Sequence, residues 1–176
     1  MPSSFVDSVP PIVKRIIDIN PRTVCDIGPG WGKYGLMCRE YLPGLERVDA
    51  VEVPQGRMPL QDHIYDNVIT ADARECSPDL WSRYDLVLMV DVIEHMDKIE
   101  GQRILGDIIN SGAEVLVSTP KIFEEQHDET NPFETHICCY TWEDFWYPGM
   151  VDHTNTDDST LDSIIITLSP KSLSVT

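Results

Sequence analysis

Short apolar segments alternate with amphipathic segments along most of the chain. Strands are predicted where Val, Ile and Leu cluster, in residues 23–27, 48–53, 67–71, 84–90, 114–118 and 163–168. Helical periodicity is clear in residues 12–19 and 98–110, and shorter helices are predicted over 32–41 and 59–65. Strands that alternate with helices indicate a parallel sheet with helices on both faces.

The pattern changes after Pro120. Residues 121–140 are polar and lack periodicity, which predicts a long loop of the kind that is often functional. A short helix is predicted to begin at Thr141, and residues 150–154 form a weaker strand that can pair antiparallel with 163–168. We therefore predict an α/β fold with a doubly wound, mostly parallel seven-stranded sheet and a terminal antiparallel hairpin. One domain covers residues 1–176.

The amino-acid composition argues against two classes of binding partner, nucleic acids and anionic membranes. The 176 residues include 13 Lys and Arg against 30 Asp and Glu, a net charge of −17. Too few basic side chains are present to neutralise phosphates over a long surface, so we expect no nucleic acid and no anionic membrane as partner. No apolar run approaches the ~20 residues of a membrane span. Five cysteines, an odd number without a framework, and no secretory signal favour a cytoplasmic location.

A glycine-rich segment, residues 26–35, joins the first predicted strand to the next helix. Glycines at such a turn let the backbone approach a nucleotide-like ligand at the carboxyl edge of the sheet. In one interpretation, Gly30, Gly32 and Gly35 form a dinucleotide fingerprint, with Glu52 at the distance of a ribose-binding acid. That ligand brings a pyrophosphate, which prefers a helix N-terminus.

In the other interpretation, Asp26, Gly28, Gly30 and Gly32 form a D-x-G-x-G-x-G pattern. An acid is unfavourable beside pyrophosphate but favourable beside a sulfonium and an ammonium. This pattern resembles motif I of the Rossmann-like S-adenosylmethionine-dependent methyltransferases. The resemblance implies that S-adenosylmethionine is the cofactor and that Asp26 and the three glycines hold its methionine end.

Three more acids follow successive strands, and the resemblance gives each a role. Glu52, with Val53 after it, would hold the two ribose hydroxyls. Asp72 and the backbone of Ala73 would lie at the adenine, and Asp91 ends the fourth strand in a string typical of the family. A lone acid after a strand is often only an N-cap, which is the alternative for Asp72 and Asp91.

The resemblance covers approximately residues 22–145. Within the family, the chain is similar to a group of small, uncharacterised methyltransferases in residues 32–35, 64–66, 84–88, 91–95, 118–120 and 131–136. It departs from many members at Pro29. The function implied is methyl transfer from S-adenosylmethionine to oxygen or nitrogen of a small-molecule acceptor.

Two histidines are candidates for a catalytic base. His95 follows the fourth strand, and His136 lies in the irregular segment that should cover the acceptor. The alternative for His95 is packing or capping in the next helix. Glu94 would orient His95 or be solvated, and Trp31 would pack beside the cofactor or in the core.

A metal site is a weaker interpretation. Its candidate ligands are His127, Asp128, His136, Cys138, Cys139 and His153. Their spacing fits no standard zinc pattern, and adjacent cysteines are poorly placed to bind one ion. Metal-dependent catechol-type transfer needs carboxylates near the fourth strand, where only Asp91 is well placed. We therefore expect no metal.

Aromatic side chains gather near the last predicted helix, at Trp142, Phe145, Trp146 and Tyr147. They form core, an acceptor pocket wall or a homodimer surface. Three other functions stay open: a cofactor-binding module that needs a partner subunit, a protein methyltransferase, and a nicotinamide-dependent oxidoreductase. The last needs a hydride-acceptor site that the sequence does not reveal.

Overall fold

The computed structural model describes residues 4–123, 125–127, 129, 131–145, 150–155 (backbone) and 161–170. Within them, seven strands form one sheet in the order β3-β2-β1-β4-β5-β7-β6. The strands are β1 Thr23–Ile27, β2 Arg47–Glu52, β3 Asn67–Thr70, β4 Leu86–Val90, β5 Glu114–Pro120, β6 Met150–Asn155 and β7 Ser163–Pro170. The first five are parallel, and β7 pairs antiparallel with β5 and β6. The predicted fold class is confirmed.

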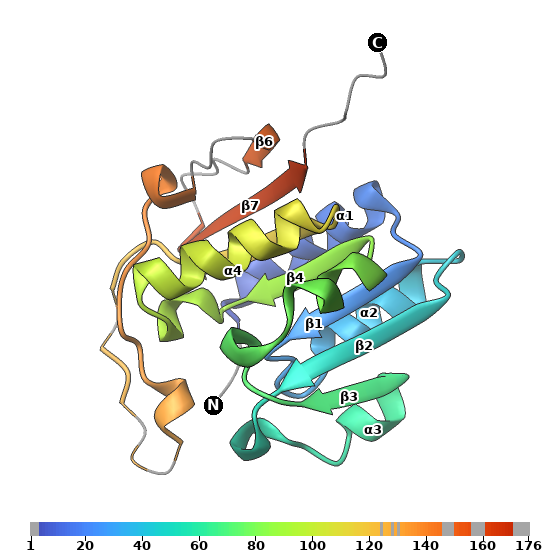
Figure 1. Cartoon of the computed structure of the whole chain (residues 1–176), viewed down its shortest axis with the longest axis horizontal. Coiled ribbons are helices and arrows are strands. Elements are labelled where there is room, and N and C mark those ends of the chain that lie inside the picture. The colour runs from blue at the N-terminus through green and yellow to red at the C-terminus, as the bar shows by residue number, and fades with distance from the viewer. Residues whose placement is uncertain are drawn as a thin grey trace.

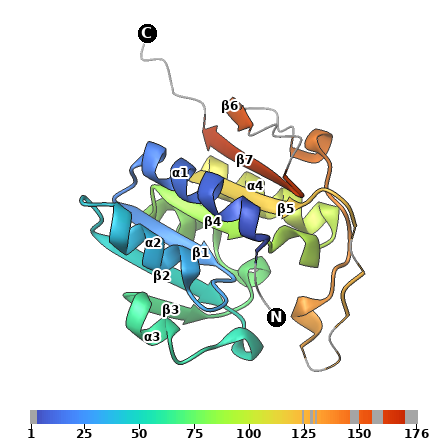
Figure 2. The same cartoon turned by 180° about the vertical axis from the view of Figure 1, so that it is seen from behind.

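Helices cover both faces of the sheet (Figure 1). They are α1 Val9–Ile19, α2 Lys33–Tyr41, α3 Gln61–Ile64 and α4 Lys98–Asn110. In Figure 1 α4 lies in front of the sheet, and Figure 2 shows α1 and α2 on the opposite face. The doubly wound arrangement therefore buries the central strands on both sides.

Alternation along β4 shows how the two apolar layers form. Leu86 and Leu88 pack in the cluster that contains the buried side of α1, whereas Val87 and Met89 pack in the cluster that contains α4. Successive side chains of a strand point to opposite faces, so a strand covered twice must be apolar at every position. This accounts for the uninterrupted apolar run in the sequence.

Local signals set several element boundaries. Asp97 caps α4, accepting a hydrogen bond from the Glu100 N–H at 2.8 Å. The predicted bounds of α4 and β1 are confirmed, but α3 covers only residues 61–64. The helix predicted to follow Thr141 is one 3-10 turn, Trp142–Phe145.

Parallel strands bring their carboxyl ends to one edge of the sheet. The chain order reverses between β1 and β4, which is the switch point where open α/β sheets bind ligands. The residues that follow β1, β2, β3 and β4 therefore meet at this edge. Among the described residues, no helix is long and apolar enough to cross a membrane.

Candidate functional site

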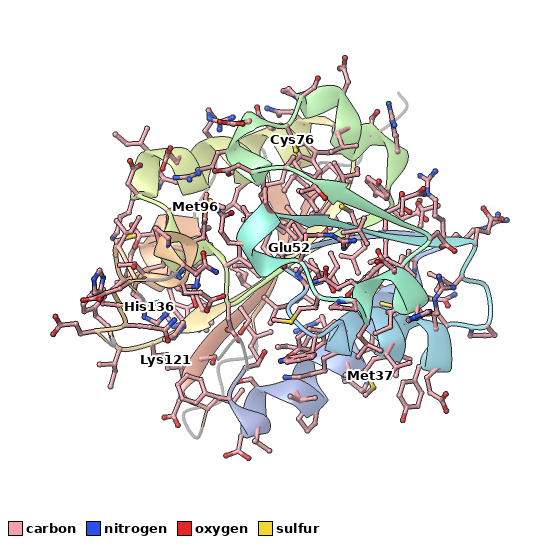
Figure 3. The ribbon with its side chains drawn as sticks, turned by 90° about the horizontal axis from the view of Figure 1, so that it is seen from below. Met37, Glu52, Cys76, Met96, Lys121 and His136 are labelled. Atoms are coloured by element: carbon pink, nitrogen blue, oxygen red, sulfur yellow. The ribbon has the colours of Figure 1, made fainter. Side chains whose placement is uncertain are left out.

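A cleft of about 590 Å³ opens at the carboxyl edge of the sheet. The predicted cofactor-binding residues that line it are Asp26, Gly28, Gly30, Glu52, Val53, Asp72, Ala73 and Asp91. His95 and His136 line it as well. In Figure 3 Glu52 lies near the middle of the view, and His136 lies to its left on the segment after β5.

The glycine loop has a backbone that side chains would disturb. Gly28, Gly30 and Gly32 all have positive φ, at 63°, 52° and 86°. A Cβ on Gly28 would lie 2.7 Å from Cγ2 of Val92, so the loop and the segment after β4 are in close contact. Gly32 is not part of the cleft wall, because it caps α2 and packs against Ile64. The tight turn therefore leaves the loop backbone itself as the wall of the cleft.

Asp26 is a buried carboxylate beneath this loop. The Tyr65 hydroxyl donates a hydrogen bond of 2.6 Å to its Oδ2. Burial raises the pKa of Asp26 to about 7, although the Tyr65 hydrogen bond acts in the opposite direction. The role of Tyr65 could not be predicted from the sequence, since nothing near this tyrosine indicates that it contacts β1.

Glu52 ends β2 with both carboxylate oxygens engaged. The Val53 N–H donates to Oε1 at 2.8 Å, and the Gln61 amide donates to Oε2 at 3.5 Å. The same amide donates to the Gly30 carbonyl at 2.7 Å, which ties the glycine loop to β2. Burial raises the pKa of Glu52 to about 7. Gln61 was not among the predicted site residues, because nothing in the sequence around it indicates a contact with Glu52.

Asp72 is both a helix cap and part of the cleft wall. It accepts a hydrogen bond from the Arg74 N–H at 2.9 Å and one from the Arg74 guanidinium at 2.6 Å. Burial acts to raise the pKa of Asp72, but its bonds with Arg74 hold it below the ordinary value. The guanidinium also lies 5.7 Å from the ring centroid of Phe133, so this cleft-lining arginine links Asp72 to the segment after β5.

Asp91 follows β4 in a strained conformation, with φ at 54°. The Ser118 hydroxyl donates to its Oδ1 at 3.2 Å. Its Oδ2 is buried and has no hydrogen-bond partner of normal geometry among the described residues. Burial raises the pKa of Asp91, and the nearby Ser4 and Ser118 hydroxyls offset this only in part. Asp91 caps no helix, so the capping alternative is wrong for this residue.

The two predicted histidines lie together, with ring centroids 5.0 Å apart. Nδ1 of His95 is 3.0 Å from the Thr135 carbonyl oxygen. A carbonyl only accepts hydrogen bonds, so Nδ1 carries the proton and Nε2 keeps its lone pair. Burial lowers the pKa of His95, which favours the neutral ring.

Glu94 completes a group with these histidines. Glu94 is only 3% exposed, so of its two alternatives the solvated carboxylate is wrong. The Thr119 hydroxyl donates to Oε2 at 3.1 Å, and burial raises the pKa of Glu94 to about 8. One potential ligand atom from each of Glu94, His95 and His136 lies within 4.8 Å of those of the other two.

Among the described residues, the metal ligands considered from the sequence form no group of three with one another. The Cys138 thiol donates to the Met96 carbonyl at 3.0 Å, whereas the Cys139 thiol is 3.8 Å from the Lys121 carbonyl. Asp128 and the side chain of His153 lie outside the described residues.

The aromatic positions divide between core and cleft. Phe145 is buried and Trp142 is partly buried against the same core cluster. Trp31 lines the cleft with half of its surface exposed. Trp146 and Tyr147 lie outside the described residues.

No protein-family model matches the chain, and no curated protein matches its sequence. Solved structures do match its fold. The N-terminal domain of EvdMO1, crystallised in the presence of S-adenosylhomocysteine and D-fucose, shares 14% identity with a TM-score of 0.70. That match covers 96% of this chain and 85% of that one.

Two larger methyltransferases are similar as well. An O-methyltransferase family protein from Burkholderia thailandensis shares 12% identity with a TM-score of 0.64, covering 94% of this chain and 57% of that one. Human N-acetylserotonin methyltransferase in complex with S-adenosylmethionine shares 14% identity with a TM-score of 0.62. This match covers 91% of this chain and 52% of that one. The chain spans about half the length of these two proteins. It has the Rossmann-like fold of the S-adenosylmethionine-dependent methyltransferases.

Proposed function

We propose that the chain binds S-adenosylmethionine in the cleft and transfers its methyl group to oxygen or nitrogen of a small-molecule acceptor. The observation that carries this proposal is that the glycine loop and the acids at the carboxyl ends of β1, β2 and β3 line a single cleft. Several solved structures with this fold hold the same cofactor or its demethylated product.

The charge of the cleft favours a cationic ligand over a pyrophosphate. Asp26 lies beneath the glycine loop, where the ammonium end of S-adenosylmethionine would lie, and an ionised carboxylate attracts that charge. A pyrophosphate at the same loop would face Asp26. Electrostatics therefore opposes the nicotinamide alternative.

Each remaining acid has a proposed contact. Glu52 would accept hydrogen bonds from both ribose hydroxyls, since each carboxylate oxygen has more than one lone pair. Asp72 would accept one from the adenine amino group, while the Ala73 N–H would bind the ring. Val53 and Asp91 would border the ribose and the methionine end. His95 and His136 then face the acceptor, where the sequence predicts a general base.

A second candidate function is a cofactor-binding module that needs a partner subunit. It is favoured by the chain's span of about half of two O-methyltransferase-type neighbours. In this case the partner would supply residues that cover the acceptor. Such a module binds the cofactor but methylates nothing alone.

Calorimetric titration with S-adenosylmethionine, S-adenosylhomocysteine and NAD in parallel tests the proposal. We expect binding of both adenosyl ligands, with affinity lost in Glu52→Ala and kept in Glu40→Ala, which removes an exposed acid of α2. Binding of NAD alone would refute the methyltransferase function. Methylation of small acceptors by the purified chain would refute the need for a partner.

A further inference from the structure

Glu94, His95 and His136 converge although His136 is about forty residues further along the chain. One potential ligand atom from each lies within 4.8 Å of the others. Two ligands that bind one ion at about 2.1 Å lie roughly 3–4 Å apart, so small side-chain movements would close this set around a cation. The group sits where the segment after β4 meets the segment after β5.

His95 is oriented as a ligand would be. Its Nδ1–H donates to the Thr135 carbonyl at 3.0 Å, and its Nε2 keeps the lone pair. Metal-binding histidines are usually held in this way, with the second ring nitrogen donating to a carbonyl or carboxylate. Because Thr135 immediately precedes His136, the same contact also positions the second histidine.

Glu94 is a buried carboxylate held by a neutral donor. The Thr119 hydroxyl donates to its Oε2 at 3.1 Å. No Lys or Arg ion pair in the described part of the chain includes Glu94, although its side chain is 97% buried. A buried carboxylate is costly unless it is paired or coordinates a metal.

Backbone hydrogen bonds hold the three residues in place. The N–H groups of Ile137 and Cys138 both donate to the Glu94 carbonyl, at 2.8 and 3.3 Å. The His136 N–H donates to the Gln126 carbonyl at 3.1 Å. The two segments are therefore joined at the cluster itself, as a preformed site requires.

We propose that Glu94, His95 and His136 bind a divalent first-row transition-metal ion at the acceptor end of the cleft. Two histidines and one carboxylate leave coordination positions open, and both histidines line the cleft. This assignment rests on the proposed function: an oxygen of the acceptor would occupy one of the open coordination positions. The bound hydroxyl would lose its proton to water, as its bond to the methyl carbon forms and the sulfur–carbon bond breaks. His95 is then a ligand rather than a base.

Cobalt(II) titration of the chelator-treated full-length chain tests the site. Binding of one ion per chain should produce the visible absorption of a site with nitrogen ligands. Glu94→Gln and His136→Gln should each weaken binding by at least about tenfold, as expected for loss of a ligand. The matched control is His63→Gln, which removes an exposed histidine of α3 and should bind like the wild type.

Binding of S-adenosylhomocysteine provides the check on folding, because none of the three residues is a proposed cofactor contact. A His136→Gln variant that binds this ligand normally but has lost cobalt supports the site. Equal cobalt affinity in His136→Gln and wild type would overturn it, as would a wild type that binds no cobalt. If Glu94→Gln does not fold, the cobalt affinity of His136→Gln relative to the wild type still tests the metal site. Failure of wild type to bind the adenosyl ligand while binding cobalt would refute the proposed function alone.

Discussion

The Tyr65 hydroxyl donates a hydrogen bond of 2.6 Å to the carboxylate of Asp26. Both side chains are buried, and the two residues belong to segments that precede β3 and end β1. A Cβ on Gly35 would lie 2.4 Å from the Tyr65 ring, so the ring also fills the space against α2. One tyrosine thus supports both the acid and the helix behind the glycine loop.

Replacing Tyr65 by Phe should destabilise the fold while keeping the ring. The carboxylate of Asp26 would lose its donor in a buried position, which costs about 1–3 kcal/mol. Urea denaturation should show this decrease in the free energy of unfolding. The matched control is Tyr41→Phe, which removes a half-exposed hydroxyl. Equal losses in the two variants would contradict the role of the buried bond.

The stability of the ligand-free protein should decrease as the pH rises towards 7. Burial raises the pKa values of Asp26 and Glu52 to about 7, well above those of the unfolded chain. At a pH between the unfolded-state and the folded-state pKa, the folded protein binds more protons than the unfolded chain does. The resulting stabilisation of the fold is therefore complete below the unfolded-state pKa and is lost as the pH rises through about 7. Denaturation curves from about pH 5.5 to 8 measure this slope. Glu52→Gln should make this pH dependence of the free energy of unfolding weaker. An unchanged slope would contradict the raised pKa of Glu52.

The affinity for S-adenosylmethionine should change in the opposite direction with pH. Ionised Asp26 attracts the cationic methionine end, and ionised Glu52 accepts from the ribose, so binding strengthens as the pH rises through about 7. Calorimetric titrations across the same range give the affinity. Asp26→Asn should reduce the dependence, whereas the exposed-acid variant Glu40→Ala should retain it. Affinity that falls with rising pH would contradict the proposed contacts.

Asp72→Asn should weaken cofactor binding while leaving the helix cap, and therefore the stability of the fold, nearly unchanged. Asparagine also caps helices, so the free energy of unfolding should change by less than about 1 kcal/mol. The adenine amino group would lose a charged acceptor, and the affinity for S-adenosylhomocysteine should fall about tenfold. An analogue with hypoxanthine in place of adenine provides the control, since wild type should reject it more strongly than the variant does. Equal discrimination by both proteins would exclude Asp72 from the adenine site.

Gly28→Ala should destabilise the loop through two separate effects. The positive φ costs an alanine about 1–2 kcal/mol, and the new methyl group would collide with Val92. Val92→Ala in the same chain removes the collision but not the strain, so the double variant should lose less stability than the sum of the singles. The control is Gly44→Ala, where a Cβ has open space. Strict additivity would show that the close approach does not matter.

Much of the fold could be predicted because it depends on local patterns. The apolar run of β4, the bounds of α4 and the positions of acids at the ends of strands are all visible in the sequence. The fold-class prediction is confirmed, and the predicted cofactor residues other than Gly32 line one cleft. Their assigned contacts with a cofactor stay predictions.

Other parts of the site could not be predicted, since they depend on contacts between distant segments. Gln61 bridges Glu52 and the Gly30 carbonyl, and Arg74 links Asp72 with Phe133. The sequence predicted no metal, because the spacing of its histidines and cysteines fits no standard zinc pattern and does not show that His136 lies beside Glu94 and His95. Of the two alternatives for Glu94, a solvated carboxylate is wrong, because segments distant in the sequence bury it.

The sequence by itself determined the hydrophobic periodicity of each helix and strand and the turn that needs glycine. It also determined which strands, in their succession along the chain, end in an acid. These follow from backbone geometry and from side chains within a few residues of one another. Only the tertiary structure decided which acids became buried and which side chains meet Glu94, because burial and electrostatics depend on the segments that pack together. Tyr65 beneath Asp26 and His136 beside His95 result from that packing.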